Sequence, residues 1–167
     1  MKVLSTDRLH LRWLEHQDSD FILELLNDRT FIDNIADRNV RTTEDAIKYI
    51  DKIRVNYLKN GLGFFLVTDH SQNKLGICGI IQRENLPDPD VGFAFLPRYT
   101  GQGIAYESAR AIMDKGVNEW NMNKICAIIS SHNERSKRLV KKLGLSYEKI
   151  VEMTPGAPVE LFVWEKK

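Results

Sequence analysis

The sequence of 167 residues predicts an α+β fold in which a mixed, mostly antiparallel central sheet is flanked by about four helices. Two observations lead to this fold class. Strand-like segments follow each other as hairpins in the middle and at the end of the chain, and such neighbours pair antiparallel. Other strand-like segments are joined through long amphipathic helices, which adds parallel crossovers. No internal repeat or linker is evident, so we expect one domain over residues 1–167.

The first part of the chain is predicted to be mainly helical. Apolar and polar residues alternate over residues 9–13, with the period of a half-buried strand. Apolar residues at helical spacing then mark two longer helices, the second of which ends at Asn60-Gly61. The expected elements are a strand over 9–13, a helix capped by Asp18 or Ser19, a short helix around Phe31–Ala36, and a helix capped by Thr42 or Thr43.

Strand signals dominate from Gly63 onward. Apolar runs are separated by turns rich in Gly, Pro, Asn and Asp. One long amphipathic helix follows the glycines of residues 101–103, and another ends at Gly144. The expected elements are strands over 64–68, 75–82, 91–96, 124–130, 146–153 and 159–165, with helices over 104–120 and from Asn133 or Glu134 to Gly144.

Composition and charge indicate an ordinary globular protein. The chain is 43% hydrophobic and 28% charged, and its net charge of +1 provides no general attraction to nucleic acid or to a membrane. The N-terminus lacks a signal-peptide core, and no apolar run approaches transmembrane length. Cys78 and Cys126 lie in apolar runs without metal-ligand spacing, so we expect buried, reduced thiols, no metal and a cytoplasmic location.

Residues 91–105 carry the strongest local signal. An apolar strand beginning at Val91 meets Pro97, which cannot donate to a ladder, and the chain then crosses Gly101 and Gly103 before the long helix begins. A strand, a glycine turn and a helix start, in this order, aim backbone N–H groups outward at the positive end of the helix dipole. We therefore expect an anion site here, with phosphate as the usual anion.

Two common phosphate-binding motifs do not fit this turn. A P-loop needs a Lys-Ser/Thr pair after Gly103, and none is present. A dinucleotide-binding turn needs a third glycine where Tyr106 stands, and an acidic residue after the next strand, which ends at Ile128-Ile129-Ser130-Ser131. This strand, turn and helix also follow a hairpin in the middle of the chain, whereas a dinucleotide-binding turn lies at the start of a βαβ repeat.

Three blocks, in order along the chain, resemble the GNAT N-acetyltransferase superfamily. Arg98-x-x-Gly101-x-Gly103-x-Ala105 is similar to its acetyl-CoA motif, and Asn133-x-x-Ser136-x-x-Leu139-x-x-Lys142-Leu143-Gly144-Leu145 is similar to its Asn/Ser helix. The opening Thr6-Asp7-Arg8-Leu9-x-Leu11-Arg12 and the string over 103–109 resemble the RimJ/RimL-like subgroup, which is the ribosomal-protein N-terminal acetyltransferase type. Together the blocks cover most of residues 6–147.

The resemblance implies the GNAT fold, with acetyl-CoA as co-substrate. The pyrophosphate of CoA would lie on the amides of the glycine turn, where glycine lets the backbone approach closely. Main-chain groups at the strand end would pair with the pantetheine arm, and Asn133 would either bind its amides or cap the helix. The expected cofactor-binding residues are Phe95, Leu96, Arg98, Gly101, Gln102, Gly103, Ile104, Ala105, Asn133 and Ser136.

Acetyl transfer also requires a base for the amine and a proton for the leaving thiolate. Asp90 and Glu84 flank the connection into the central strand, and each is either that base or an ordinary loop carboxylate. Many members of the superfamily have a Tyr seven residues after the Asn of the second block, but here that position is Val140. The resemblance leaves Ser136 as the replacement, with Tyr106 and Tyr147 as more distant candidates.

We therefore expect a cytoplasmic N-acetyltransferase that moves the acetyl group of acetyl-CoA to a primary amine, on a protein N-terminus or a small molecule. The alternative is a GNAT-fold module that binds acetyl-CoA without turnover, as a sensor or partner domain. Residues 15–59 would form the acceptor side, and their acids outnumber their bases by ten to seven, which suits a cationic acceptor but decides little. We expect a monomer or homodimer without nucleic-acid or membrane partners.

Overall fold

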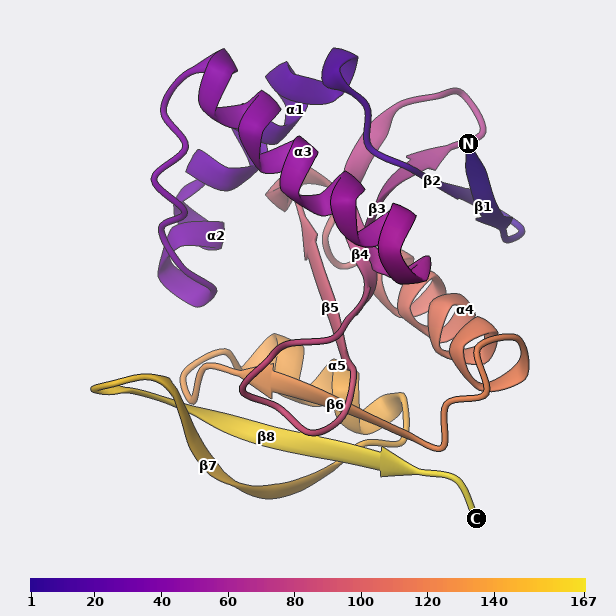
Figure 1. Ribbon diagram of the computed structural model, residues 1–167, viewed down its shortest axis with the longest axis vertical. Coiled ribbons are helices and arrows are strands. Elements are labelled where there is room, and N and C mark those ends of the chain that lie inside the picture. Colours follow the sequence, from indigo (N-terminus) through magenta and orange to yellow (C-terminus); the bar gives the residue numbers. More distant parts are fainter.

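The computed structural model describes residues 1–167 and contains one eight-stranded sheet in the order β1-β2-β3-β4-β5-β6-β8-β7. Neighbouring strands are antiparallel except for β5 and β6, which are parallel and joined through helix α4 (Figure 1). The predicted α+β class with a mixed, mostly antiparallel sheet is confirmed. The strands are β1 (Lys2–Ser5), β2 (Leu9–Arg12), β3 (Gly63–Asp69), β4 (Lys74–Ile81), β5 (Asp90–Phe95), β6 (Lys124–Ile129), β7 (Ser146–Thr154) and β8 (Ala157–Glu165).

Five α-helices pack against this sheet and against each other. α3 contacts β3 and α1, α4 contacts β4 and β5, and α5 contacts β6. Their buried apolar side chains join those of the strands in one continuous core. The helices are α1 (Ser19–Asn27), α2 (Arg29–Asn34), α3 (Thr43–Asn60), α4 (Ile104–Asn118) and α5 (Glu134–Lys142). None of them combines the length and the apolar character needed to cross a bilayer.

The ends of the longer helices follow the capping residues that the sequence indicates. The Thr42 side chain accepts a hydrogen bond from a backbone N–H in the first turn of α3 at 3.1 Å. The Asn133 side chain accepts one from the Ser136 N–H of α5 at 3.2 Å. Gly61 follows α3 with a φ of +77°, the left-handed conformation that glycine adopts freely. These predicted boundaries are confirmed.

Two N-terminal elements differ from the sequence prediction. The prediction omits β1, a strand of four residues whose ends are exposed and whose side chains alternate too briefly to show a period. β1 forms an antiparallel hairpin with β2. α2 begins at Arg29 instead of near Phe31, because the Asp28 carboxylate caps it by accepting the Thr30 N–H at 2.9 Å.

Asp18 precedes α1, as expected, but its side chain does not cap that helix. The fully buried carboxylate accepts hydrogen bonds from both Nη atoms of Arg12 on β2 at 2.9 Å and pairs with Lys74 on β4 at 2.7 Å. Burial by itself would raise the pKa of Asp18, but the bonds from Arg12 and Lys74 outweigh burial and hold the pKa below its ordinary value. Asp18 therefore ties the N-terminal helices to the sheet as an anion.

β5 and β6 pair only where β5 begins. Their ladder consists of one residue pair, Asp90 opposite Cys126. Beyond that pair the strands diverge: β5 rises steeply, whereas β6 lies with β7 and β8 in the lower part of Figure 1. The edge of β5 from Gly92 to Phe95 therefore has no strand partner toward β6, although β4 pairs with its other edge. This opening holds the candidate site.

Candidate active site

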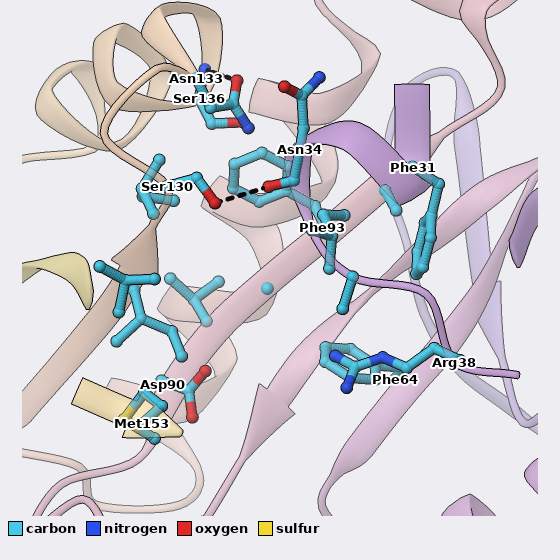
Figure 2. Close-up of a pocket in the computed structure, with 18 of the residues that line it drawn as sticks. Phe31, Asn34, Arg38, Phe64, Asp90, Phe93, Ser130, Asn133, Ser136 and Met153 are labelled. Carbon is cyan, nitrogen blue, oxygen red and sulfur yellow. Dashed lines mark hydrogen bonds between the residues drawn. The ribbon is translucent and has the colours of Figure 1, made fainter. Parts of the chain in front are cut away.

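A cavity of about 300 Å³ occupies the opening between β5 and β6 (Figure 2). This volume is at the small end of the range for ligand pockets. The Ser130 hydroxyl at the end of β6 donates to the Asn34 carbonyl at the end of α2 at 3.0 Å, which ties two sides of the cavity together. Most of the lining is hydrophobic, and four aromatic side chains contribute: Phe31, Tyr49, Phe64 and Phe93.

A second cavity of about 110 Å³ adjoins the first. It lies between the end of β5 and the start of α4 on one side and α5 on the other, where Phe95, Ala105 and Arg135 line it. Asn133 and Ser136 line both cavities, so the two cavities meet beside the start of α5. This arrangement suits an extended molecule with one end at the glycine turn and the other in the larger cavity.

The glycine turn presents a run of backbone donors without partners. The N–H groups of the six residues from Gly101 to Tyr106 donate to no acceptor within the protein. Gly101 and Gly103 have φ values of +77° and +78°, which are left-handed conformations. Because α4 begins directly after Gly103, these donors lie at the positive end of a helix dipole. Such a run of N–H groups is suited to phosphate.

Other residues expected at this turn contribute backbone rather than side chain. Ile104 is 7% exposed, so its side chain lies in the core and only its N–H is available. The Gln102 side-chain amide donates to the Arg98 carbonyl at 3.3 Å, which leaves the Gln102 N–H free. Phe95 and Ala105, by contrast, line the smaller cavity directly.

The N-terminal block containing Thr6 and Arg8 braces the turn. Arg8 Nη1 donates to the Gln102 carbonyl at 2.9 Å, and Arg8 Nε pairs with Glu107 on α4 at 2.7 Å. The Thr6 hydroxyl donates to the same Glu107 carboxylate at 2.5 Å. These contacts hold the turn between the first loop of the chain and α4. The sequence alone indicates this block only as a resemblance and assigns it no role.

Asp90 is the carboxylate that the fold brings to the larger cavity. Its side chain is 2% exposed, and Oδ1 accepts a hydrogen bond from Arg83 Nε at 3.1 Å. Burial raises the pKa of Asp90 above its ordinary value, and the Arg83 partner offsets that effect only in part. No other acidic side chain lines the cavity. A buried carboxylate with a raised pKa is suited to accept and return a proton.

Besides the residues of the glycine turn, three of the residues expected at the site lie apart from these cavities. Glu84 is exposed in the connection between β4 and β5 and lines neither cavity. The Arg98 side chain is 58% exposed and pairs with Glu24 on α1 at 3.3 Å. Leu96 is buried, and its N–H already donates to a carbonyl of β4 at 3.1 Å. Of the two candidate bases, the structure therefore brings only Asp90 to the cavity.

Asn133 and Ser136 stand where the two cavities meet. Asn133 uses its side-chain oxygen as the helix cap, which leaves its amide Nδ2 free, and the Ser136 hydroxyl has no partner within the protein. The cap and the ligand roles of Asn133 are therefore compatible. Val140 is 0% exposed, so a side chain at that position packs in the core instead of reaching the cavity. Tyr106 and Tyr147 line neither cavity.

The sequence prediction assigns most of the lining no role, and it misses in particular Arg38, Tyr49 and Arg83. Tyr49 lies at the flank of the apolar stripe of α3; burial raises its pKa, and the charges of Arg38 and Arg83 lower it. Both arginines come from irregular connections, where no periodic pattern exists to mark them. None of the acids of residues 15–59 lines the cavity, so the acidic excess counted in that segment lies elsewhere.

Comparisons with known proteins agree with this geometry. The family model for the acetyltransferase (GNAT) domain matches residues 8–146. The chain is 33% identical over 155 residues to the uncharacterized protein YkkB of Bacillus subtilis, covering 89% of this chain and 87% of that protein. A 52-residue segment, 31% of this chain, is 36% identical to spermidine N(1)-acetyltransferase of Escherichia coli and covers 28% of that protein. The fold is similar to RimL, a ribosomal L7/L12 alpha-N-protein acetyltransferase in complex with coenzyme A, with a TM-score of 0.87, 13% identity, and 99% of this chain and 98% of that chain covered.

Proposed function

The chain belongs to the GNAT acetyltransferase family and is an acetyl-CoA-dependent acyltransferase, and from this premise we propose that it transfers the acetyl group to the nitrogen of a primary amine by direct attack. The observation that carries the proposal is the meeting of the two cavities. One leads from the free N–H groups of the glycine turn, and the other ends at the buried Asp90 carboxylate. The thioester is placed where they meet, beside Asn133 and Ser136.

In this proposal the cofactor lies along the smaller cavity. The pyrophosphate accepts hydrogen bonds from the N–H groups of residues 101–106, and the pantetheine arm follows the unpaired edge of β5. The free Nδ2 of Asn133 donates to an amide of that arm. Arg135 lines the smaller cavity, is exposed and forms no ion pair, which suits a contact with a CoA phosphate.

Asp90 serves as the base in this proposal. A primary alkylamine has a pKa of about 10, so at neutral pH nearly all of it is protonated and unreactive. Asp90 takes the amine proton, directly or through one water. The neutral nitrogen then bonds to the carbonyl carbon of the thioester, the carbon–sulfur bond breaks, and CoA leaves as a thiolate. The nitrogen releases its second proton to solvent, which leaves a neutral amide. The N–H groups along the open edge of β5 stabilise the negative charge that develops on the carbonyl oxygen.

Ser136 assists the leaving group. Its free hydroxyl lies where the cavities meet and donates a hydrogen bond to the departing sulfur. A thiol has a pKa of about 8.5, so its thiolate is only a modest base and solvent supplies its proton. The family's tyrosine is therefore not required, and Val140 remains a core residue.

Release of free CoA thiol from acetyl-CoA in the presence of a panel of amines tests the proposal, together with calorimetric titration of acetyl-CoA. We expect cofactor binding and amine-dependent thiol release. Asp90→Asn should lower kcat by about 10²–10⁴-fold without changing the affinity for acetyl-CoA. The matched control is Asp88→Asn, which removes a carboxylate two residues away that lines neither cavity.

Two outcomes would contradict the proposal. Binding of acetyl-CoA without thiol release for any amine would support a module that only binds the cofactor. Failure to bind acetyl-CoA at millimolar concentration would contradict both functions.

A further inference from the structure

We propose that the acceptor is a small monoamine that carries one carboxylate on an apolar body, as the apolar amino acids do. The inference rests on the proposed transfer to an amine and names the substrate class of that site. Three properties of the larger cavity carry it: the balance of charge in its lining, the chemistry of its walls, and its volume.

The charged side chains of the lining leave one positive charge without a partner. They are Arg38, Arg83 and Asp90, and the last two pair with each other at 3.1 Å. Arg38 forms no ion pair and no hydrogen bond within the protein, although its side chain reaches the cavity. A guanidinium group binds a carboxylate through two parallel hydrogen bonds, which makes a carboxylate its best-matched ligand.

The positions of the charges divide the cavity into two ends. In Figure 2, Arg38 lies near Phe64, well away from Asn133 and Ser136, and Asp90 lies on another side. The amine must reach Asp90 and the thioester, so the Arg38 end is left for the rest of the acceptor. Tyr49 lies close enough to Arg38 to be affected by its charge, and its hydroxyl has no hydrogen-bond partner within the protein. Arg38 and Tyr49 are therefore two donors of the lining that have no partner within the protein.

The rest of the lining is mainly apolar. Phe31, Phe64 and Phe93 line the cavity together with aliphatic side chains of β4, β6 and the β7–β8 hairpin. An apolar body gains free energy by leaving water for such walls, whereas hydroxyl or ammonium groups would lose their water partners without replacement. The same walls therefore disfavour aminoglycosides and other strongly polar amines.

Polyamines fit the charge balance poorly. The second and third ammonium groups of spermidine would enter a cavity whose single carboxylate already pairs with Arg83 and whose other charge is positive. The volume of about 300 Å³ does not distinguish spermidine from an amino acid, but it limits the acceptor to a small molecule because the cavity must also admit the acetyl group. An acceptor of the size of one amino acid fits this space.

Matched pairs of acceptors test the inference. Rates are measured for L-leucine, L-phenylalanine and 6-aminohexanoate, for their counterparts without the charge (leucinamide, phenylalaninamide and hexylamine), and for spermidine. We expect kcat/KM to be at least tenfold higher for each carboxylate than for its counterpart, and spermidine to be the poorest. An amino acid amide has the less basic amine of its pair, so its larger neutral fraction works against the expected result.

Substitution of Arg38 provides the second arm. Arg38→Gln should lower kcat/KM for the carboxylates ten- to a hundredfold, mainly through KM, and leave the rates with the uncharged amines and the KM of acetyl-CoA unchanged. Lys48→Gln is the matched control, since it removes one positive charge from an exposed position of α3 beside Tyr49 and outside the cavity.

The outcomes separate this inference from the proposed function. Faster transfer to spermidine or to the uncharged amines, or an equal loss for both classes in Arg38→Gln, overturns the inference while transfer to amines stands. If no amine is acetylated, the proposed function fails, and calorimetric titration of leucine and leucinamide into the complex with CoA decides the inference. Binding of leucine but not of leucinamide, lost in Arg38→Gln, would uphold Arg38 as the carboxylate site of the cavity without the transfer, and any other binding pattern would overturn it.

Discussion

The left-handed backbone of the glycine turn allows a prediction with a matched internal control. Gly101 in the turn and Gly156 at the tip of the β7–β8 hairpin have φ values of +77° and +79°. No heavy atom lies within 4 Å of a Cβ added at either position. Gly101→Ala and Gly156→Ala therefore each introduce one left-handed alanine and no clash. The cost is about 1–2 kcal/mol of folding free energy, or roughly 2–8 °C in Tm for a chain of this length.

The two variants should differ sharply in cofactor binding. Relief of the strain at position 101 turns the N–H groups of residues 101–106 away from their common direction, and binding must restore it. The strain energy is lost only once: as far as the turn relaxes, it is lost from binding instead of from folding. Kd for acetyl-CoA should therefore rise by a factor of up to about 5–30, and Gly101→Ala should lose correspondingly less stability than Gly156→Ala. Gly156 lines neither cavity, so Gly156→Ala should bind as the wild type does. Thermal unfolding and calorimetric titration of the three proteins measure both quantities.

Two results would refute this reasoning. If Gly101→Ala kept the wild-type Kd while losing clearly less stability than Gly156→Ala, the turn would have relaxed without effect on binding, and its free N–H groups would not be the phosphate site. If both variants bound acetyl-CoA equally weakly, the loss of affinity would reflect general instability and not the direction of the N–H groups in the turn.

Three further predictions concern single charged residues. Asp90 acts as a base only when it is ionised, and burial raises its pKa, so kcat/KM should rise with pH through a value above the ordinary pKa of an aspartate. If Asp90→Asn showed the same rise of kcat/KM with pH, the assignment of Asp90 as the base would be wrong. Arg8→Ala removes the contacts that brace the turn and should weaken acetyl-CoA binding severalfold in a titration, with no change in acceptor KM. Arg29→Ala, which removes an exposed arginine of α2, should leave acetyl-CoA binding unchanged. Asp18→Asn leaves a buried pair incomplete and should cost about 3–5 kcal/mol in urea unfolding. Because its pKa is lowered in the folded state, the wild-type contribution of Asp18 should be full at neutral pH and be lost as the pH falls below the ordinary aspartate value; stability independent of pH in that range would contradict this.

Neighbouring residues along the chain determine much of this fold. The helix caps at Thr42 and Asn133 and the stop at Gly61 are local hydrogen bonds or local φ values, and the structure contains each of them. β1 is the exception, since four residues are too few to show a period and the strand forms only because β2 lies beside it. Asp18 illustrates the same limit, because its partner Lys74 is 56 residues away in sequence.

Some features of the candidate site are likewise determined by adjacent residues, and others only by the tertiary structure. The glycine turn needs only adjacent residues: two glycines with positive φ and the helix that follows them create the run of free N–H groups. The choice between Asp90 and Glu84 is not local, because both are carboxylates beside the same connection. It depends on how β5 meets β6, which buries Asp90 in the cavity and leaves Glu84 exposed.

The sequence by itself therefore determined the fold class, most element boundaries and the family with its acetyl-CoA chemistry, because periodicity, caps and turn conformations depend on residues a few positions apart. Only the tertiary structure decided the environment of the acceptor. Arg38, Tyr49 and Arg83 come from three separate segments, and no pattern along the chain predicts that they line one cavity with Asp90. Side chains far apart in sequence are brought together by packing and by the divergence of two strands, and that convergence sets the charge an acceptor meets.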